Sequence, residues 1–216
     1  AREALATFWE SVADLGRWSP VQRTLLDVFM GHWSLEYSPG YVLADFMGRV
    51  VSPYETNPLN LNPLRGLLES QVDFEAVWNC RQFKLFLSAT NVETGRVKVF
   101  KGQEINADVV LASACLPFLF QAVEIDGVPY WDGGFMGNPV LFPFFDSKSC
   151  SDVVIVQINP VYRKGAPRTA REIMDRVNEI TFNASLLREF RAIDFVARLL
   201  EEGRLSPEEY NAVRVH

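Results

Sequence analysis

The segment that most constrains the fold is a run of β-branched residues from Val153 to Ile158, with the sequence VVIVQI. It lacks the alternation of polar and apolar residues shown by a strand with one face in water. Such runs are typical of strands buried on both faces, in parallel sheets covered by helices. Helical and strand patterns also alternate after residue 60. We therefore expect an α/β domain with three layers, α/β/α, and a mostly parallel sheet flanked by helices.

The 216 residues suffice for one domain with a sizeable core, because 48% of them are hydrophobic. No repeat or linker divides them, so we predict a single domain over residues 1–216. One segment, at about 31–62, is rich in proline, glycine and aromatic residues and lacks a regular period. Long irregular segments are functional or disordered. This one could be a lid or a lipid-facing cap, or ordered coil packed on the body.

Bulk properties exclude several classes of protein. The net charge of −6 gives no footprint for nucleic acid, so we expect no nucleic-acid partner. No apolar run approaches the roughly 18 residues that a membrane span needs. Three cysteines without CxxC spacing, Cys80, Cys115 and Cys150, argue against a zinc site and a disulfide framework. They favour a reducing compartment, and we expect a cytoplasmic protein.

Asp132 is the candidate catalytic carboxylate. It follows a short aromatic strand and precedes Gly133 and Gly134. Glycine allows positive φ and close approach of the backbone to another group, and catalytic groups gather just beyond strand ends in α/β folds. An aspartate there can deprotonate a hydroxyl nucleophile. The tripeptide by itself favours an ordinary turn in which the aspartate caps its own backbone.

Other chemistries find little support. The two histidines are His32 and His216, so a Ser-His-Asp triad within the chain would need one of them. A metal site could use Glu124, Asp126 and Asp132, but the hairpin predicted here, with its turn at Asp126-Gly127, would put these carboxylates on different faces. We expect neither a metal nor a cofactor.

The wider stretch from Ala112 to Pro139 resembles the second catalytic block of the patatin-like phospholipases. It contains A-S-x-x-x-P at Ala112–Pro117, then a hairpin, then Tyr130-x-Asp-Gly-Gly. The supporting motif residues are Ser113, Pro117, Asn138 and Pro139. The adjacent Asn-Pro pair is more similar to the bacterial branch of the family.

This resemblance implies a lipid acyl hydrolase, that is, a serine esterase or phospholipase. Asp132 would be the acid/base of a Ser-Asp dyad, with Gly133 and Gly134 in its signature turn. The substrate would be a lipid or another acyl ester, and the protein could contact a membrane surface peripherally.

The chain departs from the family pattern in one respect. The family carries its serine in G-x-S-x-G, after a glycine-rich loop that supplies oxyanion-hole amides. Neither motif occurs here, and Ser34, Ser38 and Ser113 lack the flanking glycines. We therefore expect that the N-terminal part of the domain is missing, that the serine and oxyanion loop lie in that missing part or in an N-terminal companion fragment, and that this chain alone is inactive. The alternative is a catalytically inactive lipid-binding or scaffold module of the same fold.

Overall fold

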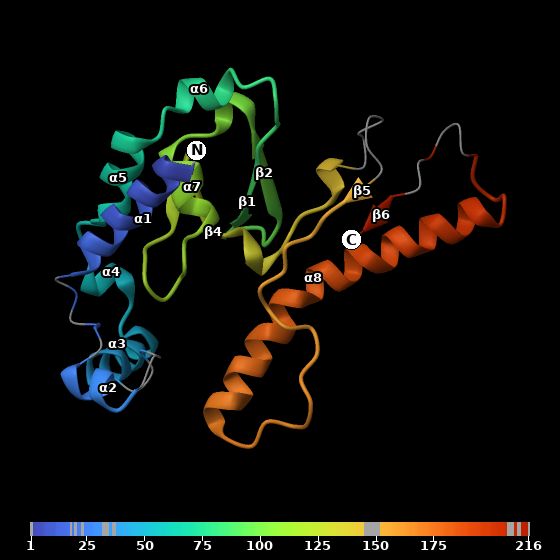
Figure 1. Ribbon diagram of the computed structural model, residues 1–216. Coiled ribbons are helices and arrows are strands. Elements are labelled where there is room, and N and C mark those ends of the chain that lie inside the picture. The colour runs from blue at the N-terminus through green and yellow to red at the C-terminus, as the bar shows by residue number, and fades with distance from the viewer. Residues whose placement is uncertain are drawn as a thin grey trace.

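The computed structural model describes residues 2–17, 19, 21–22, 24–31, 35, 38–144, 152–206, 210 and 213–215. Figure 1 shows a twisted sheet with helices on both sides: α1, α5 and α7 lie on one side, and the long helix α8 lies on the other. The expected α/β class with a sheet flanked by helices is confirmed.

The helices are α1 (Arg2–Gly16), α2 (Leu25–Phe29), α3 (Pro39–Val50), α4 (Pro53–Thr56), α5 (Pro63–Gln71), α6 (Phe74–Trp78), α7 (Ala107–Ser113) and α8 (Ala170–Glu201). The strands are β1 (Phe86–Asn91), β2 (Val97–Lys101), β3 (Val123–Ile125), β4 (Val128–Asp132), β5 (Asp152–Val153) and β6 (Arg214–Val215). Short 3₁₀ helices are η2 (Gly102–Glu104), η3 (Gly133–Phe135) and η4 (Phe142–Phe144).

The main sheet has the strand order β2-β1-β4-β3, and every neighbouring pair is antiparallel. The predicted hairpin between β3 and β4 is confirmed, with φ of 52° at Asp126 and 77° at Gly127, as a type I′ turn requires. The main sheet is antiparallel, so the expectation of a mostly parallel sheet is wrong for these four strands. Two of the three pairs are hairpins, whose short connections make neighbours antiparallel, whereas parallel strands need a long crossover.

The prediction of a buried strand over Val153–Ile158 is wrong. Only Asp152–Val153 is a strand, and it pairs in parallel with β6. Val154, Val156 and Ile158 are 75%, 88% and 92% exposed. A β-branched run is buried in a sheet only if strands lie on both sides of it. Within the described part of the chain, no strand pairs with the residues after Val153.

The total accessible surface is unusually large for the size of the chain. Its accessible surface is 16044 Å², whereas a compact monomer of 24.5 kDa exposes about 10,000 Å². The additional accessible surface leaves room for extensive contact with another polypeptide or with lipid.

The segment at about 31–62 is not irregular throughout, because it contains α3 and α4. Ser38 precedes Pro39 at the start of α3, and Ser52 and Glu55 form a capping box around α4. Proline at the first helical position begins a helix rather than breaking one, because its missing N–H needs no partner there. Residues 32–34, 36 and 37 lie outside the described residues.

The core lies between the sheet and α7. It contains Ala89 of β1, Phe100 of β2 and Tyr130 of β4, packed against Val109 and Ala112 of α7. Asn106 caps α7 by accepting a hydrogen bond from the amide of Val109 at 3.0 Å. This packing fixes the C-terminal end of α7 beside the end of β4.

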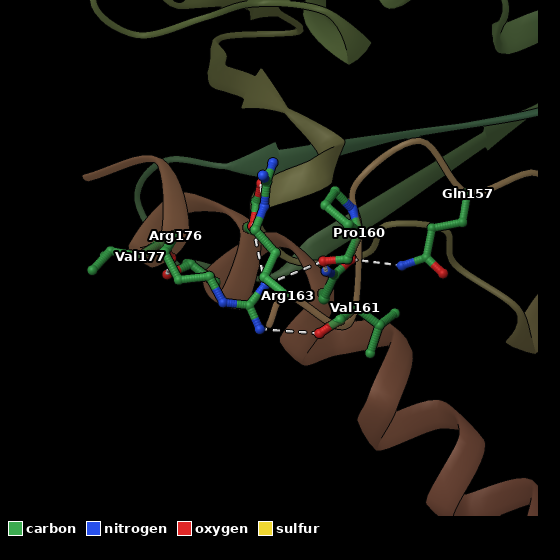
Figure 2. A network of polar contacts seen from close by, with 9 residues as sticks. Gln157, Pro160, Val161, Arg163, Arg176 and Val177 are labelled. Atoms are coloured by element: carbon green, nitrogen blue, oxygen red, sulfur yellow. Dashed lines mark hydrogen bonds and ion pairs between the residues drawn. The ribbon is translucent and has the colours of Figure 1, made fainter. Parts of the chain in front are cut away.

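Helix α8 begins with a capping box formed by Thr169 and Glu172. Figure 2 shows how it holds the segment before it: Arg176 donates to the carbonyl oxygens of Pro160 and Val161 at 3.3 and 3.0 Å. Arg163 reaches back to Glu179 on the helix, with an Nη2–Oε1 distance of 2.6 Å. These contacts tie residues 160–163 to the first three turns of α8.

Candidate active site

Asp132 is the last residue of β4, and its backbone is held from two sides. Its amide donates to the carbonyl oxygen of Cys115, just after α7, at 2.9 Å. Its carbonyl oxygen accepts a hydrogen bond from the Thr90 hydroxyl of β1 at 2.8 Å. The position of the carboxylate is therefore set by α7 and by β1, and not by the turn alone.

The side chain of Asp132 also caps its own turn. Oδ1 accepts a hydrogen bond from the Gly134 amide at 2.7 Å and begins η3. No hydrogen bond reaches Oδ2 within the described residues. Every fully buried side-chain oxygen in this part of the chain has a hydrogen-bond partner, so Oδ2, which has none, is not fully buried and is accessible. One oxygen thus serves the turn, and the other is available for chemistry.

Partial burial raises the pKa of Asp132, and the Gly134 N–H opposes this shift by stabilising the charged form. A carboxylate with a raised pKa is a stronger base than an ordinary aspartate. The electrostatic environment therefore suits a group that must accept a proton from a hydroxyl.

Close packing restricts both glycine positions, most strongly that of Gly133, which faces backbone atoms. A Cβ on Gly133 would lie 2.2 Å from the backbone oxygen of Ser88, and one on Gly134 would lie 2.8 Å from Cε1 of Phe182. Neither glycine has a positive φ. Of the two explanations for this motif, close approach applies and the left-handed conformation does not.

A cavity of about 490 Å³ lies around Asp132. The motif residues that line it with Asp132 are Ser113, Gly134, Asn138 and Pro139. Gly133 is buried under β1, and Pro117 lies in the turn after α7, outside the cavity lining. The structure thus brings together residues of the A-S-x-x-x-P, Asp-Gly-Gly and Asn-Pro segments.

Sequence reasoning missed the polar and aromatic residues that complete this cavity, namely Phe86, Ser88, Phe144, Asn159 and Phe182. Ser88 could have been found, because it alternates in β1 with the core residues Leu87 and Ala89. Phe182 comes from α8 and gives no local signal, since it meets Gly134 across about fifty residues of sequence.

Helix α8 forms one wall of the site. The hydroxyl of Ser185 accepts from the Asn138 amide at 3.1 Å, and Oε2 of Glu189 accepts from the Leu141 amide at 2.8 Å. Burial raises the pKa of Glu189, opposed by this hydrogen bond. The wall therefore depends on a partly buried carboxylate and a buried serine.

The other candidate nucleophiles differ in their surroundings. Ser38 is 1% exposed and donates to the carbonyl oxygen of Gln22 at 2.7 Å, a structural contact. Cys115 is buried, and burial raises the pKa of its thiol, which disfavours the reactive thiolate. His32, Ser34 and His216 lie outside the described residues.

Two further properties concern ligands and membranes. Among the described residues, no group of three histidine, cysteine or acidic side chains could hold a metal ion, so Glu124, Asp126 and Asp132 do not form one. In the same part of the chain, no helix is long and apolar enough to span a bilayer.

The comparisons with known proteins agree with the motif. No curated protein matches the chain. The model of the family described as patatin-like phospholipase matches residues 18–145, which is more than half of the chain and includes every motif residue around Asp132. The chain belongs to the patatin-like phospholipase family.

Proposed function

We propose that Asp132 is the acid/base of a Ser-Asp dyad that hydrolyses acyl esters of lipids. The family consists of lipid acyl hydrolases. The observation that carries the proposal is the state of Asp132, whose Oδ2 is accessible while burial raises the pKa of the carboxyl. A turn residue that served only to cap η3 would need neither the cavity nor the shifted pKa.

In the proposed reaction, a serine hydroxyl attacks the ester carbonyl while Oδ2 of Asp132 accepts its proton. The tetrahedral intermediate collapses, and Asp132 returns the proton to the departing alcohol, which leaves an acyl-serine. Water then attacks the acyl-serine and loses its proton to Asp132. Asp132 returns that proton to the serine oxygen as the acyl bond breaks, which releases the fatty acid and the free serine. Asp132 thus ends each turnover as a carboxylate.

We propose that the serine comes from polypeptide outside these 216 residues, in an N-terminal part or companion fragment. The sequence contains no G-x-S-x-G. The exposed run Val154–Ile158 has the composition of a sheet interior and could pair with strands of such a companion. On this proposal the isolated chain is inactive.

The test uses the product of the parent gene and a chromogenic short-chain ester. Asp132→Asn should lower kcat by at least about a hundredfold, because general-base catalysis contributes that much or more. The matched control is Asp126→Asn, which alters a hairpin-turn carboxylate. Turnover of Asp132→Asn close to that of the control would rule out the assignment.

A fluorophosphonate that labels activated serines tests the source of the nucleophile. The isolated chain should remain unlabelled, and the parent gene product should be labelled outside residues 1–216. Ser88 and Ser113 line the cavity with Asp132, so both are changed to alanine as controls. Labelling of the isolated chain that either change abolishes would contradict the external serine.

The second candidate function is a catalytically inactive lipid-binding or scaffold module. It is favoured by the use of Asp132 Oδ1 as an ordinary cap for η3. Absence of a labelled serine in the parent gene product would support it. Cytoplasmic localisation and peripheral contact with a membrane surface stay predictions, and fractionation of cells into soluble and membrane parts would test them.

A further inference from the structure

A second groove, of about 830 Å³, runs along the edge strand β2. Val97, Val99 and Lys101 line it, whereas Phe100 belongs to the core under α7. Lys98, which alternates with these residues, and Ile105 of the core also line it. The groove therefore follows the open edge of β2 and takes side chains from both faces of the sheet.

The floor of this groove is apolar and partly fixed. Trp78, Phe83, Leu85 and Phe142 line it. The indole N–H of Trp78 donates to the carbonyl oxygen of Ile105 at 2.6 Å, which holds the ring in place. Phe83 and Leu85 are 62% and 38% exposed. Large apolar side chains gathered in a concave surface mark a site for an apolar ligand.

The rim of the groove is positively charged. The chain has five lysines, and three of them, Lys84, Lys98 and Lys101, line the groove, while no acidic residue does. Lys98 pairs with Glu104 at 3.0 Å, but Lys84 and Lys101 have no ion pair within the described residues. Lysine stems can cover an alkyl chain while their ammonium groups hold an anion at the water boundary. The groove is therefore suited to a negatively charged amphiphile, although the whole chain carries a charge of −6.

The groove adjoins the cavity around Asp132. Phe86, Val99 and Pro143 line both of them. The ring of Phe86 packs edge-on against Phe144 with the centroids 5.5 Å apart. One extended ligand can therefore reach from the carboxylate into the groove.

We propose that this groove binds the part of an anionic phospholipid beyond the scissile ester, with an alkyl chain on the aromatic floor and the phosphate against Lys84 and Lys101. The placement of the ester at Asp132 rests on the proposed function. The binding does not, because it requires no nucleophile. The isolated chain therefore binds single-chain anionic phospholipids without hydrolysing them.

The test titrates the 216-residue chain with a 16-carbon lysophosphatidylglycerol, below its micelle concentration, and follows the heat of binding. A lysophosphatidylcholine of the same chain length is titrated in parallel. We expect saturable binding of one molecule, with the anionic lipid bound about fivefold more tightly, since an exposed charge contact adds up to about that factor. Absence of saturable binding, or equal affinity for both lipids, would overturn the proposal.

Two double variants test which side chains bind the phosphate and which bind the alkyl chain. Lys84→Gln with Lys101→Gln should remove the preference for the anionic lipid, whereas the control Lys164→Gln, outside the groove, should keep it. Phe83→Ser with Leu85→Ser should weaken the binding of both lipids about tenfold, because apolar contact is lost. The control for this pair is Phe195→Ser on α8, which is 55% exposed. Retained preference in the lysine variant would also overturn the proposal.

These outcomes are separable from those for the proposed function. Lipid binding by the isolated chain without Asp132-dependent hydrolysis by the parent gene product contradicts the catalytic proposal alone. Asp132-dependent hydrolysis without binding in the groove contradicts the groove assignment alone.

Discussion

Residues 86–141 and residues 152–201 both carry long apolar segments, yet they use them differently. In the first region, Ala89, Val109 and Ala112 are at most 1% exposed. In the second, Val154, Val156 and Ile158 are at least 75% exposed, and α8 buries only a few residues. The first region closes its own core through hairpins and α7. The second has apolar residues of the same kind, but the described residues offer them no neighbouring strands. Composition therefore shows a capacity for burial, and burial itself depends on neighbours.

The largest difference in stability is expected between substitutions at Ile105 and at Ile158, which are 1% and 92% exposed. Ile105→Ala should lower the free energy of unfolding by about 3 kcal/mol, because it leaves a cavity in the packed region. Ile158→Ala should change it by less than about 0.5 kcal/mol, as expected of an exposed position. Urea unfolding of both variants makes the measurement. A cost above about 1 kcal/mol for Ile158→Ala would show that another surface covers this segment in solution.

The second comparison concerns glycines in the same two regions. Gly133→Ala should cost about 3 kcal/mol, because its Cβ would lie 2.2 Å from a backbone oxygen that cannot swing away. Gly165 has φ of +84° and nothing within 4 Å, so Gly165→Ala should cost about 1 kcal/mol from backbone strain alone. Thermal unfolding of the two variants gives their order. Equal losses would mean that the turn at Gly133 opens easily, contrary to its packing against β1.

The smallest effect concerns Asp132, where the two regions meet. Asp132→Ala should cost about 1 kcal/mol through loss of the cap on Gly134. Asp132→Asn keeps an acceptor oxygen and removes a charge that burial disfavours, so it should be at least as stable as the native chain at pH 7.

The pH dependence of stability tests the same residue. Because burial raises the folded pKa of Asp132, the native state binds more protons than the unfolded chain between the unfolded pKa, about 3.9, and the folded pKa. The contribution of Asp132 to stability therefore falls as pH rises through this window and is constant above it. Urea unfolding from pH 3.5 to 7 should show this decline as a fall in the stability of the native chain relative to Asp132→Asn. An identical pH profile in both proteins would exclude the raised pKa.

Local signals determined many elements of the fold. The hairpin turn at Asp126-Gly127, the caps at Asn106 and Thr169, and the helix after Ser38-Pro39 each follow from residues within a few positions of one another. The first three were predictable for that reason. The helix α3 was missed because its aromatic and glycine content obscured the capping signal.

The sequence by itself predicted the family, which the family model confirms, and singled out Asp132 and its two glycines as candidates. Only the tertiary structure decided what surrounds them, because the contacts of Gly133 with Ser88, Gly134 with Phe182, and Asp132 with Cys115 join distant segments. It also decided that the run after Val153 lies exposed. The physical reason is the same in each case: a residue's type fixes what it can contact, and the arrangement of the chain fixes which of those contacts exist.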